Sequence, residues 1–178
     1  MTKGKNTYQI DQSGKVEDTA INTVVACSNG KQYALLVTAK DKRRLQENFR
    51  RNGVGRLFMI FTFATLIHLL IRKANIKDNK IFVDIEYQGH TKTIEDIVSR
   101  LNEDVDIRWK LVGKSSNAHE VAIQTKRGKR KADARVGARE IWSLVIAAGR
   151  FSTTTLRVDR RSATASKKNI AKKSKKVK

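Results

Sequence analysis

The sequence predicts an α/β fold in which helices cover both faces of a five-stranded mixed sheet. Three strand-like segments open the chain, and helical and strand-like patterns then alternate. The expected order is three antiparallel strands followed by helix, strand, helix, strand and helix. Such an order is typical of a layered α/β domain.

The three opening strands are marked by their apolar patterns and by a turn. Residues 7–12 alternate, residues 23–28 form an apolar run, and residues 33–38 follow after Asn29-Gly30. Asn-Gly is a strong two-residue hairpin signal, because both positions of that turn need positive φ. The chain is therefore expected to open as a three-stranded antiparallel meander.

The later segments alternate between helix and strand. Residues 80–86 are nearly continuous in apolar character, which suits a central strand buried on both faces. Residues 106–112 alternate as a strand, and residues 91–102 carry apolar side chains at helical spacing. Helices are expected at 42–51, 57–71, 91–102, 115–124 and 132–148.

The most apolar segment, 57–71, is expected to be a buried core helix. It is shorter than the roughly 20 residues that span a bilayer, and it contains Thr62, Thr65 and His68. The first residues, MTKGKNTYQ, show no apolar leader. The single cysteine, Cys27, cannot form a disulfide framework. We therefore expect a cytoplasmic (intracellular) protein that does not bind membranes.

The chain is strongly basic. Its 178 residues include 38 lysines and arginines against 17 acids, which gives a formal net charge of +21, and 39% are hydrophobic, enough for a core. Such a charge attracts polyanions, and nucleic acid is the commonest because each neutralised phosphate releases counterions. We expect one domain over residues 1–149 and a basic, disordered tail over residues 150–178.

Acidic side chains occupy three points of this predicted order. Asp11 ends the first strand, Asp84 and Glu86 lie in the fourth, and Asp133 stands at the start of the last helix. Residues two apart in a strand share a face, so Asp84 and Glu86 can point the same way. Taken singly, each acid has a simpler explanation as a turn residue, a partner of lysine or a first-turn helix residue.

Element order and acids together resemble the ribonuclease H-like superfamily, which includes ribonucleases H, RuvC-type resolvases and DDE transposases. The resemblance covers about residues 7–148 and is carried by Asp11 before Ser-Gly, by FVDIEYQG and by the Ala-Asp pair of KRKADARVG. It implies that the first and fourth strands are neighbours. It also implies that Asp11, Asp84 or Glu86, and Asp133 converge as catalytic metal ligands.

The implied activity is divalent-metal-dependent hydrolysis of phosphodiester bonds in structured nucleic acid, either an RNA–DNA hybrid or branched DNA. Mg²⁺ (or Mn²⁺) favours carboxylate oxygens, and two ions about 4 Å apart can stabilise the attacking and leaving oxygens. The alternative is a catalytically inactive nucleic-acid-binding protein of the same fold. No small-molecule cofactor is expected, and a homodimer follows only by analogy with RuvC-type enzymes.

A basic run directly before Asp133 is expected to contact phosphates without reading sequence. His119 could assist a proton transfer, although a surface position on a helix is the simpler interpretation. Few aromatic residues interleave the basic segments, so a stacking platform for single strands is not expected. The residues expected to bind nucleic acid are Lys126, Arg127, Lys129, Arg130 and Lys131.

Overall fold

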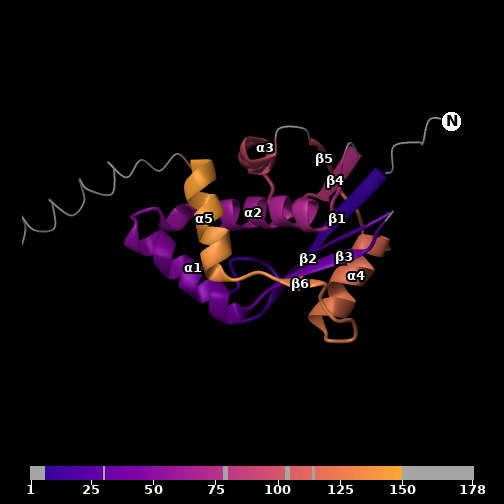
Figure 1. The fold of residues 1–178 in the computed structure, drawn as a ribbon, viewed down its shortest axis with the longest axis horizontal. Helices are drawn as coiled ribbons and strands as arrows, with labels where there is room; N and C mark the ends of the chain where they lie inside the picture. Colours follow the sequence, from indigo (N-terminus) through magenta and orange to yellow (C-terminus); the bar gives the residue numbers. More distant parts are fainter. Residues whose placement is uncertain (1–6, 30, 78–79, 103–104, 114, 150–178) are drawn as a thin grey trace, which may run out of the picture. The chain divides into compact units, whose positions relative to one another are not determined.

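The computed structural model describes residues 7–149 except 30, 78–79, 103–104 and 114, and over these residues it shows a six-stranded sheet and five α-helices (Figure 1). The chain divides into two units, Met1–Ala148 and Gly149–Lys178, and the predicted tail, 150–178, lies outside the described residues. The elements are β1 (Thr7–Ser13), β2 (Thr23–Ser28), β3 (Tyr33–Val37), α1 (Ala39–Arg51), η1 (Gly55–Leu57), α2 (Phe58–Lys73), β4 (Lys80–Asp84), α3 (Thr91–Leu101), β5 (Asp106–Lys110), α4 (Asn117–Lys126), β6 (Ala134–Arg135) and α5 (Ala138–Gly149).

The strands lie in the order β5-β4-β1-β2-β3-β6. β1, β2 and β3 form the predicted antiparallel meander, while β4 runs parallel to β1 on its other side and β5 runs parallel to β4. The α/β class and the mixed sheet are therefore confirmed. The expectation of five strands was wrong, because β6 adds a sixth strand parallel to β3.

The sixth strand also corrects the predicted last helix, 132–148. Residues 134–135 pair with residues 35–36 of β3, and α5 begins only at Ala138. β3 is almost wholly buried, and its outer backbone groups need hydrogen-bond partners. This tertiary requirement overrides the helical propensity of an alanine-bearing segment.

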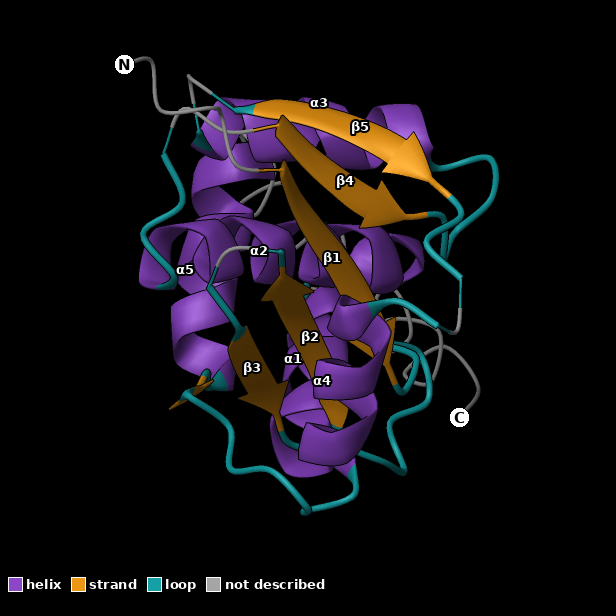
Figure 2. Ribbon diagram, turned by 90° about the vertical axis from the view of Figure 1, so that its right-hand side faces the viewer, coloured by secondary structure: helices purple, strands orange, loops and turns teal. Residues whose placement is uncertain are grey.

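Helices cover both faces of the sheet (Figure 2). α4 packs against β1, β2 and β3, and its residues Val121 and Ala122 contact a small-residue surface that includes Ala26 and Ala34. α2 packs against the opposite face and also contacts α1 and α3. Apolar side chains are found around the whole circumference of α2, as expected for a helix that is buried on every side.

α2 lies within the stretch Gly55–Lys73, which has the length and hydropathy of a membrane span. However, 72% of the apolar window in this stretch is buried inside the fold. The residues from Ile60 to Ile71 are all buried, including the polar Thr62, Thr65 and His68. The prediction of a core helix is confirmed.

Candidate metal centre

Two of the predicted acids lie on neighbouring parallel strands, Asp11 within β1 and Asp84 at the end of β4. Ile10 of β1 is paired with Val83 of β4, so the residues that follow, Asp11 and Asp84, come side by side. Asp11 is also directly opposite Ala26, a residue of the surface packed against α4. Directly opposite residues share a face of the sheet. Asp11 therefore points to the α4 side.

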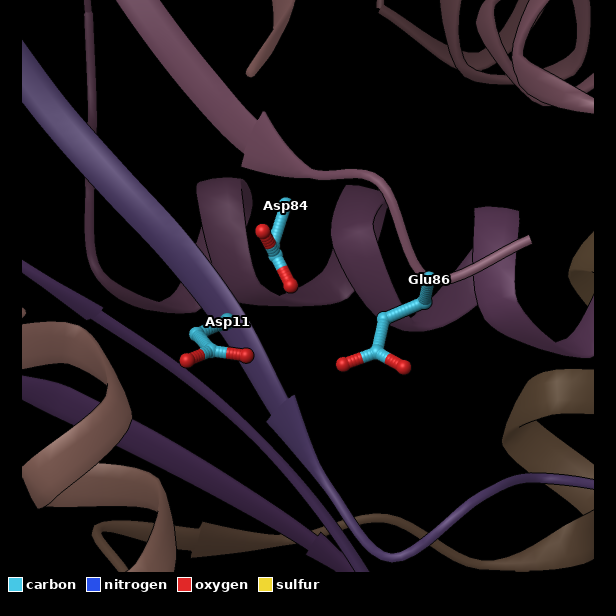
Figure 3. A group of neighbouring side chains, drawn as sticks. All are labelled: Asp11, Asp84 and Glu86. Atoms are coloured by element: carbon cyan, nitrogen blue, oxygen red, sulfur yellow. The ribbon is translucent and has the colours of Figure 1, made fainter. Parts of the chain in front are cut away.

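Glu86 completes a cluster of three carboxylates (Figure 3). It follows the end of β4 by two residues, and one oxygen each from Asp11, Asp84 and Glu86 lies within 4.8 Å of the other two. The sequence left open whether Asp84 or Glu86 would join Asp11, and the fold brings both to it. Such a group of carboxylates could hold a metal ion.

The cluster concentrates negative charge where water is scarce. Asp11 is only 4% exposed, and burial raises its pKa, although bonds to the Gln12 amide and His119 oppose this effect. Burial, followed by the charges of Asp11 and Asp84, raises the pKa of Glu86 to about 7. A divalent cation would relieve the mutual repulsion and give the hard oxygens a ligand bond each. The donor set thus fits Mg²⁺ or Mn²⁺.

Backbone amides orient both aspartates. The Gln12 amide donates to Asp11 Oδ1 over 2.6 Å, and the Val112 amide, just after β5, donates to Asp84 Oδ1 over 2.7 Å. Each carboxylate oxygen has two lone pairs. These bonds therefore fix the side chains without exhausting their capacity to bind a cation.

His119 is the residue that sequence reasoning undervalued. Its Nδ1 lies 2.8 Å from Asp11 Oδ2, and its side chain is 23% exposed. The Ser116 hydroxyl caps α4 by accepting from the His119 amide over 3.1 Å, which fixes His119 in the first turn. The sequence SSNAHEVA predicts this cap, but it carries no signal that α4 lies across β1.

Tyr87 ties the segment that carries Glu86 to the turn after β1. Its hydroxyl accepts from the Gln12 side-chain amide and the Val16 backbone amide, each over 3.1 Å, and donates to Glu17 Oε2 over 3.1 Å. Tyr87 is buried, with 6% of its surface exposed. No sequence signal marks it, because its partners are some 70 residues away.

The fold does not bring Asp133 to the cluster. Asp133 Oδ2 accepts from the Ala34 amide and from the Arg130 guanidinium, each over 2.8 Å. These bonds hold it at the edge of β3, directly before β6. Because α5 begins at Ala138, Asp133 is not at the start of a helix as predicted. Its carboxylate instead satisfies a backbone donor of the sheet edge.

The predicted phosphate-binding run forms the end of α4 and the loop before β6. Lys126 lies over the turn after β1, since a Cβ placed on Gly14 would be 3.2 Å from Lys126 Cε. Farther along, Arg130, Lys131 and Arg135 contribute to the lining of a pocket of about 550 Å³. Cations therefore extend from the turn after β1 to the β3 edge. Arg127 and Lys129 of the same run are exposed.

The chain matches no protein-family model, no curated protein and no solved structure. Relatives therefore supply no function for it. What remains is the geometry of the acid cluster, its contact with His119 and the charge of the chain.

Proposed function

We propose that the protein is a divalent-metal-dependent nuclease that hydrolyses phosphodiester bonds in structured nucleic acid, an RNA–DNA hybrid or branched DNA. The observation that carries the proposal is the convergence of Asp11, Asp84 and Glu86 within 4.8 Å. One of these carboxylates is buried and two are partly buried, and such mutually repelling groups are costly to keep together unless they bind a cation. In a chain of net charge +21, the grouping of three carboxylates in one place favours a functional site.

The arrangement of the strands supports a ribonuclease H-like fold as part of this proposal. β1 and β4 are adjacent, as the resemblance implied, and they run parallel, while β1, β2 and β3 form an antiparallel meander. Within the order β5-β4-β1-β2-β3, only β2 runs against the others. In this interpretation, β6 is a short addition at the edge.

The residues of the chain would divide the chemistry between them. Asp11, Asp84 and Glu86 would hold Mg²⁺ or Mn²⁺, which supplies Lewis-acid stabilisation of charge on the phosphodiester. His119 keeps Asp11 oriented through Nδ1 and has a second ring nitrogen, Nε2, with which to take or give a proton. The basic run that begins at Lys126 would hold phosphates on both sides of the cleaved bond.

The alternative function is a catalytically inactive nucleic-acid-binding protein. Asp133 favours it, because this acid is neutralised by Arg130 and leaves the cluster with three carboxylates. Against it stand the contacts of the remaining acids. Within the described residues, Asp11 is bonded to the Gln12 amide and to His119, and Asp84 is bonded to the Val112 amide, whereas neither forms an ion pair with lysine or arginine.

Cleavage assays distinguish the two functions. End-labelled RNA–DNA hybrid and four-way-junction DNA would be incubated with the full chain in Mg²⁺ or Mn²⁺. We expect cleavage that EDTA abolishes and that Asp11→Asn or Asp84→Asn lowers more than about 100-fold, because each change removes a ligand. Nucleic-acid affinity should stay equal or rise, since each change removes negative charge.

Asp133→Asn is the matched control, because it neutralises an acid outside the cluster. Its cleavage rate should stay within about threefold of the unaltered protein. If neither substrate is cleaved while both are bound, the protein is the inactive binding protein. If Asp11→Asn cleaves normally, the acid cluster is not the active site.

A further inference from the structure

The α4 side of the sheet continues beyond the metal centre onto β4 and β5. Figure 2 shows α4 in front of β2, whereas β4 and β5 carry no helix on that side within the described part of the chain. In β4, Ile81 and Val83 are buried, so the alternate residues Lys80, Phe82 and Asp84 point to the open side. Phe82 is partly exposed there.

β5 presents cations to the same open side. In the strand register Arg108 is paired with Phe82, and Lys110 is paired with Asp84. The Arg108 side chain is 53% exposed and is paired with Asp106 of the same strand over 3.2 Å, and Lys110 Nζ lies 5.9 Å from the centre of the Phe82 ring. An aromatic ring is therefore bordered by Lys80 on its own strand and by two cations on the next.

We propose that this open surface (Lys80, Phe82, Arg108 and Lys110) binds a single-stranded segment of nucleic acid next to the metal centre. The inference rests on the proposed function and specifies which form of the strand enters the site. A phenylalanine ring can stack on an unpaired base, whereas bases inside a duplex are already covered by their neighbours. The surrounding cations suit the phosphates of the same strand.

The surface leads directly to the acid cluster. Phe82 precedes Asp84 by two strand residues, about 7 Å, so nucleotides of one strand can reach both the ring and the acids. At the rim, Leu111 is 71% exposed, and the amide of the next residue, Val112, bonds to Asp84. An exposed apolar side chain at this place suits contact with an unstacked base.

The aromatic contribution can be measured by fluorescence anisotropy. Labelled single-stranded DNA and a duplex of the same length would be titrated with the full chain in EDTA, so that nothing is cleaved. Phe82→Leu should weaken single-strand binding about fivefold or more, because stacking is lost, and should change duplex binding less than twofold. Phe82→Tyr keeps a ring and should bind single strands within twofold of the unaltered chain. Thermal denaturation would establish that each variant is folded.

The cationic contribution can be measured from the salt dependence of binding. Arg108→Gln with Lys110→Gln should lower the slope of log affinity against log salt for single strands by about 1.4, about 0.7 for each lost phosphate contact. The matched control is Arg51→Gln with Lys92→Gln, two exposed cations on α1 and α3 that are each paired with an acid, as Arg108 is with Asp106. The control should change the slope by less than about 0.5.

Several outcomes would overturn this surface as a single-strand site: single-strand binding unaffected by Phe82→Leu, equal loss of duplex binding, or equal slopes for the two cation pairs. The proposed nuclease activity is tested separately. If the unaltered protein cleaves nucleic acid but Phe82→Leu binds single strands normally, the nuclease proposal stands and the single-strand site is wrong. If single-strand binding requires Phe82 but the protein cleaves neither substrate, the single-strand site stands and the nuclease proposal is wrong.

Discussion

At the residue scale, Glu86 has the largest electrostatic cost in the acid cluster. Burial and the charges of Asp11 and Asp84 raise its pKa to about 7, above the usual value of 4.5. Without a metal ion, the folded chain therefore binds a proton at Glu86 that the unfolded chain releases at lower pH. Stability falls as pH rises from about 4.5 to about 7, because the folded state binds more protons over that range.

Replacing Glu86 with glutamine should stabilise the metal-free protein above pH 7. The gain should be near zero at pH 4.5, where Glu86 is protonated, and reach about 1–2 kcal/mol at pH 8. Urea denaturation in EDTA measures it, and Glu95→Gln on α3 is the control. A gain that does not depend on pH would contradict the origin assigned to it. Adding Mg²⁺ should stabilise the unaltered chain more than the variant.

His119 connects α4 to the acid cluster, and its role can be separated from metal binding. His119→Ala should lower the single-turnover cleavage rate about 100-fold, as expected for loss of a general acid or base. His119 contacts Asp11 but is not one of the three residues that could hold the metal ion. The affinity of the variant for Mn²⁺ should therefore fall less than tenfold. Cleavage at the unaltered rate would remove His119 from the mechanism.

The same residues show what the sequence can and cannot predict about the site. Asp11, Asp84 and Glu86 were predicted because the resemblance implies acids in the first and fourth strands. Strand periodicity added only that Asp84 and Glu86 could share a face, and β4 in fact ends at Asp84, so Glu86 reaches the cluster from the segment that follows. His119 was not predictable, since its importance depends on the crossing of α4 over β1. Asp133 was misplaced because helical spacing in the sequence cannot show that the edge of β3 needs a partner first.

At the scale of elements, the turn after β1 holds several parts of the site together. Gly14 has φ +81°, and a Cβ there would clash with the Asn22 carbonyl oxygen and press on Lys126. Lys42 of α1 reaches the same loop: its Nζ donates to the carbonyls of Lys15 and Asp18. The turn is therefore fixed by Lys42 of α1 and by Tyr87, which lies between β4 and α3.

Gly14→Ala should therefore destabilise the fold more than another glycine substitution at positive φ. Gly89 is the matched control, because its φ is +79° and no atom lies within 4 Å of the Cβ it would gain. Both variants place alanine at positive φ, which lowers the free energy of unfolding. Gly14→Ala should lower it by at least about 1 kcal/mol more, because its Cβ also clashes. Urea denaturation compares them. Equal losses would show that the turn is not closely packed.

The elements themselves were largely predictable, as was the β1-β2-β3 meander, but the place of β6 at the edge of the sheet was not. Apolar runs and turn residues located the strands and α2, because those patterns reflect burial along one segment. The surface around Phe82 was missed for a different reason. Its ring lies on β4 and two of its cations lie on β5, so the sequence shows them far apart, and only the strand register joins them.

At the scale of the whole molecule, the acid cluster is a local exception in a chain of net charge +21. In the proposed nuclease, the overall charge would attract nucleic acid, whereas the carboxylates of a metal-free cluster would repel the phosphate to be cleaved. Metal binding and productive nucleic-acid binding should therefore support each other. This coupling depends on the cluster binding a divalent cation.

Calorimetric titration of Mn²⁺ into the metal-free protein at pH 8 tests directly whether the acid cluster binds a divalent cation. At this pH Glu86 is mainly ionised, so protons compete little with the metal. We predict saturable binding that Asp11→Asn abolishes or weakens more than tenfold and that Asp133→Asn leaves unchanged. The same isotherm for all three proteins would contradict the account, because the three carboxylates would then not form a metal site.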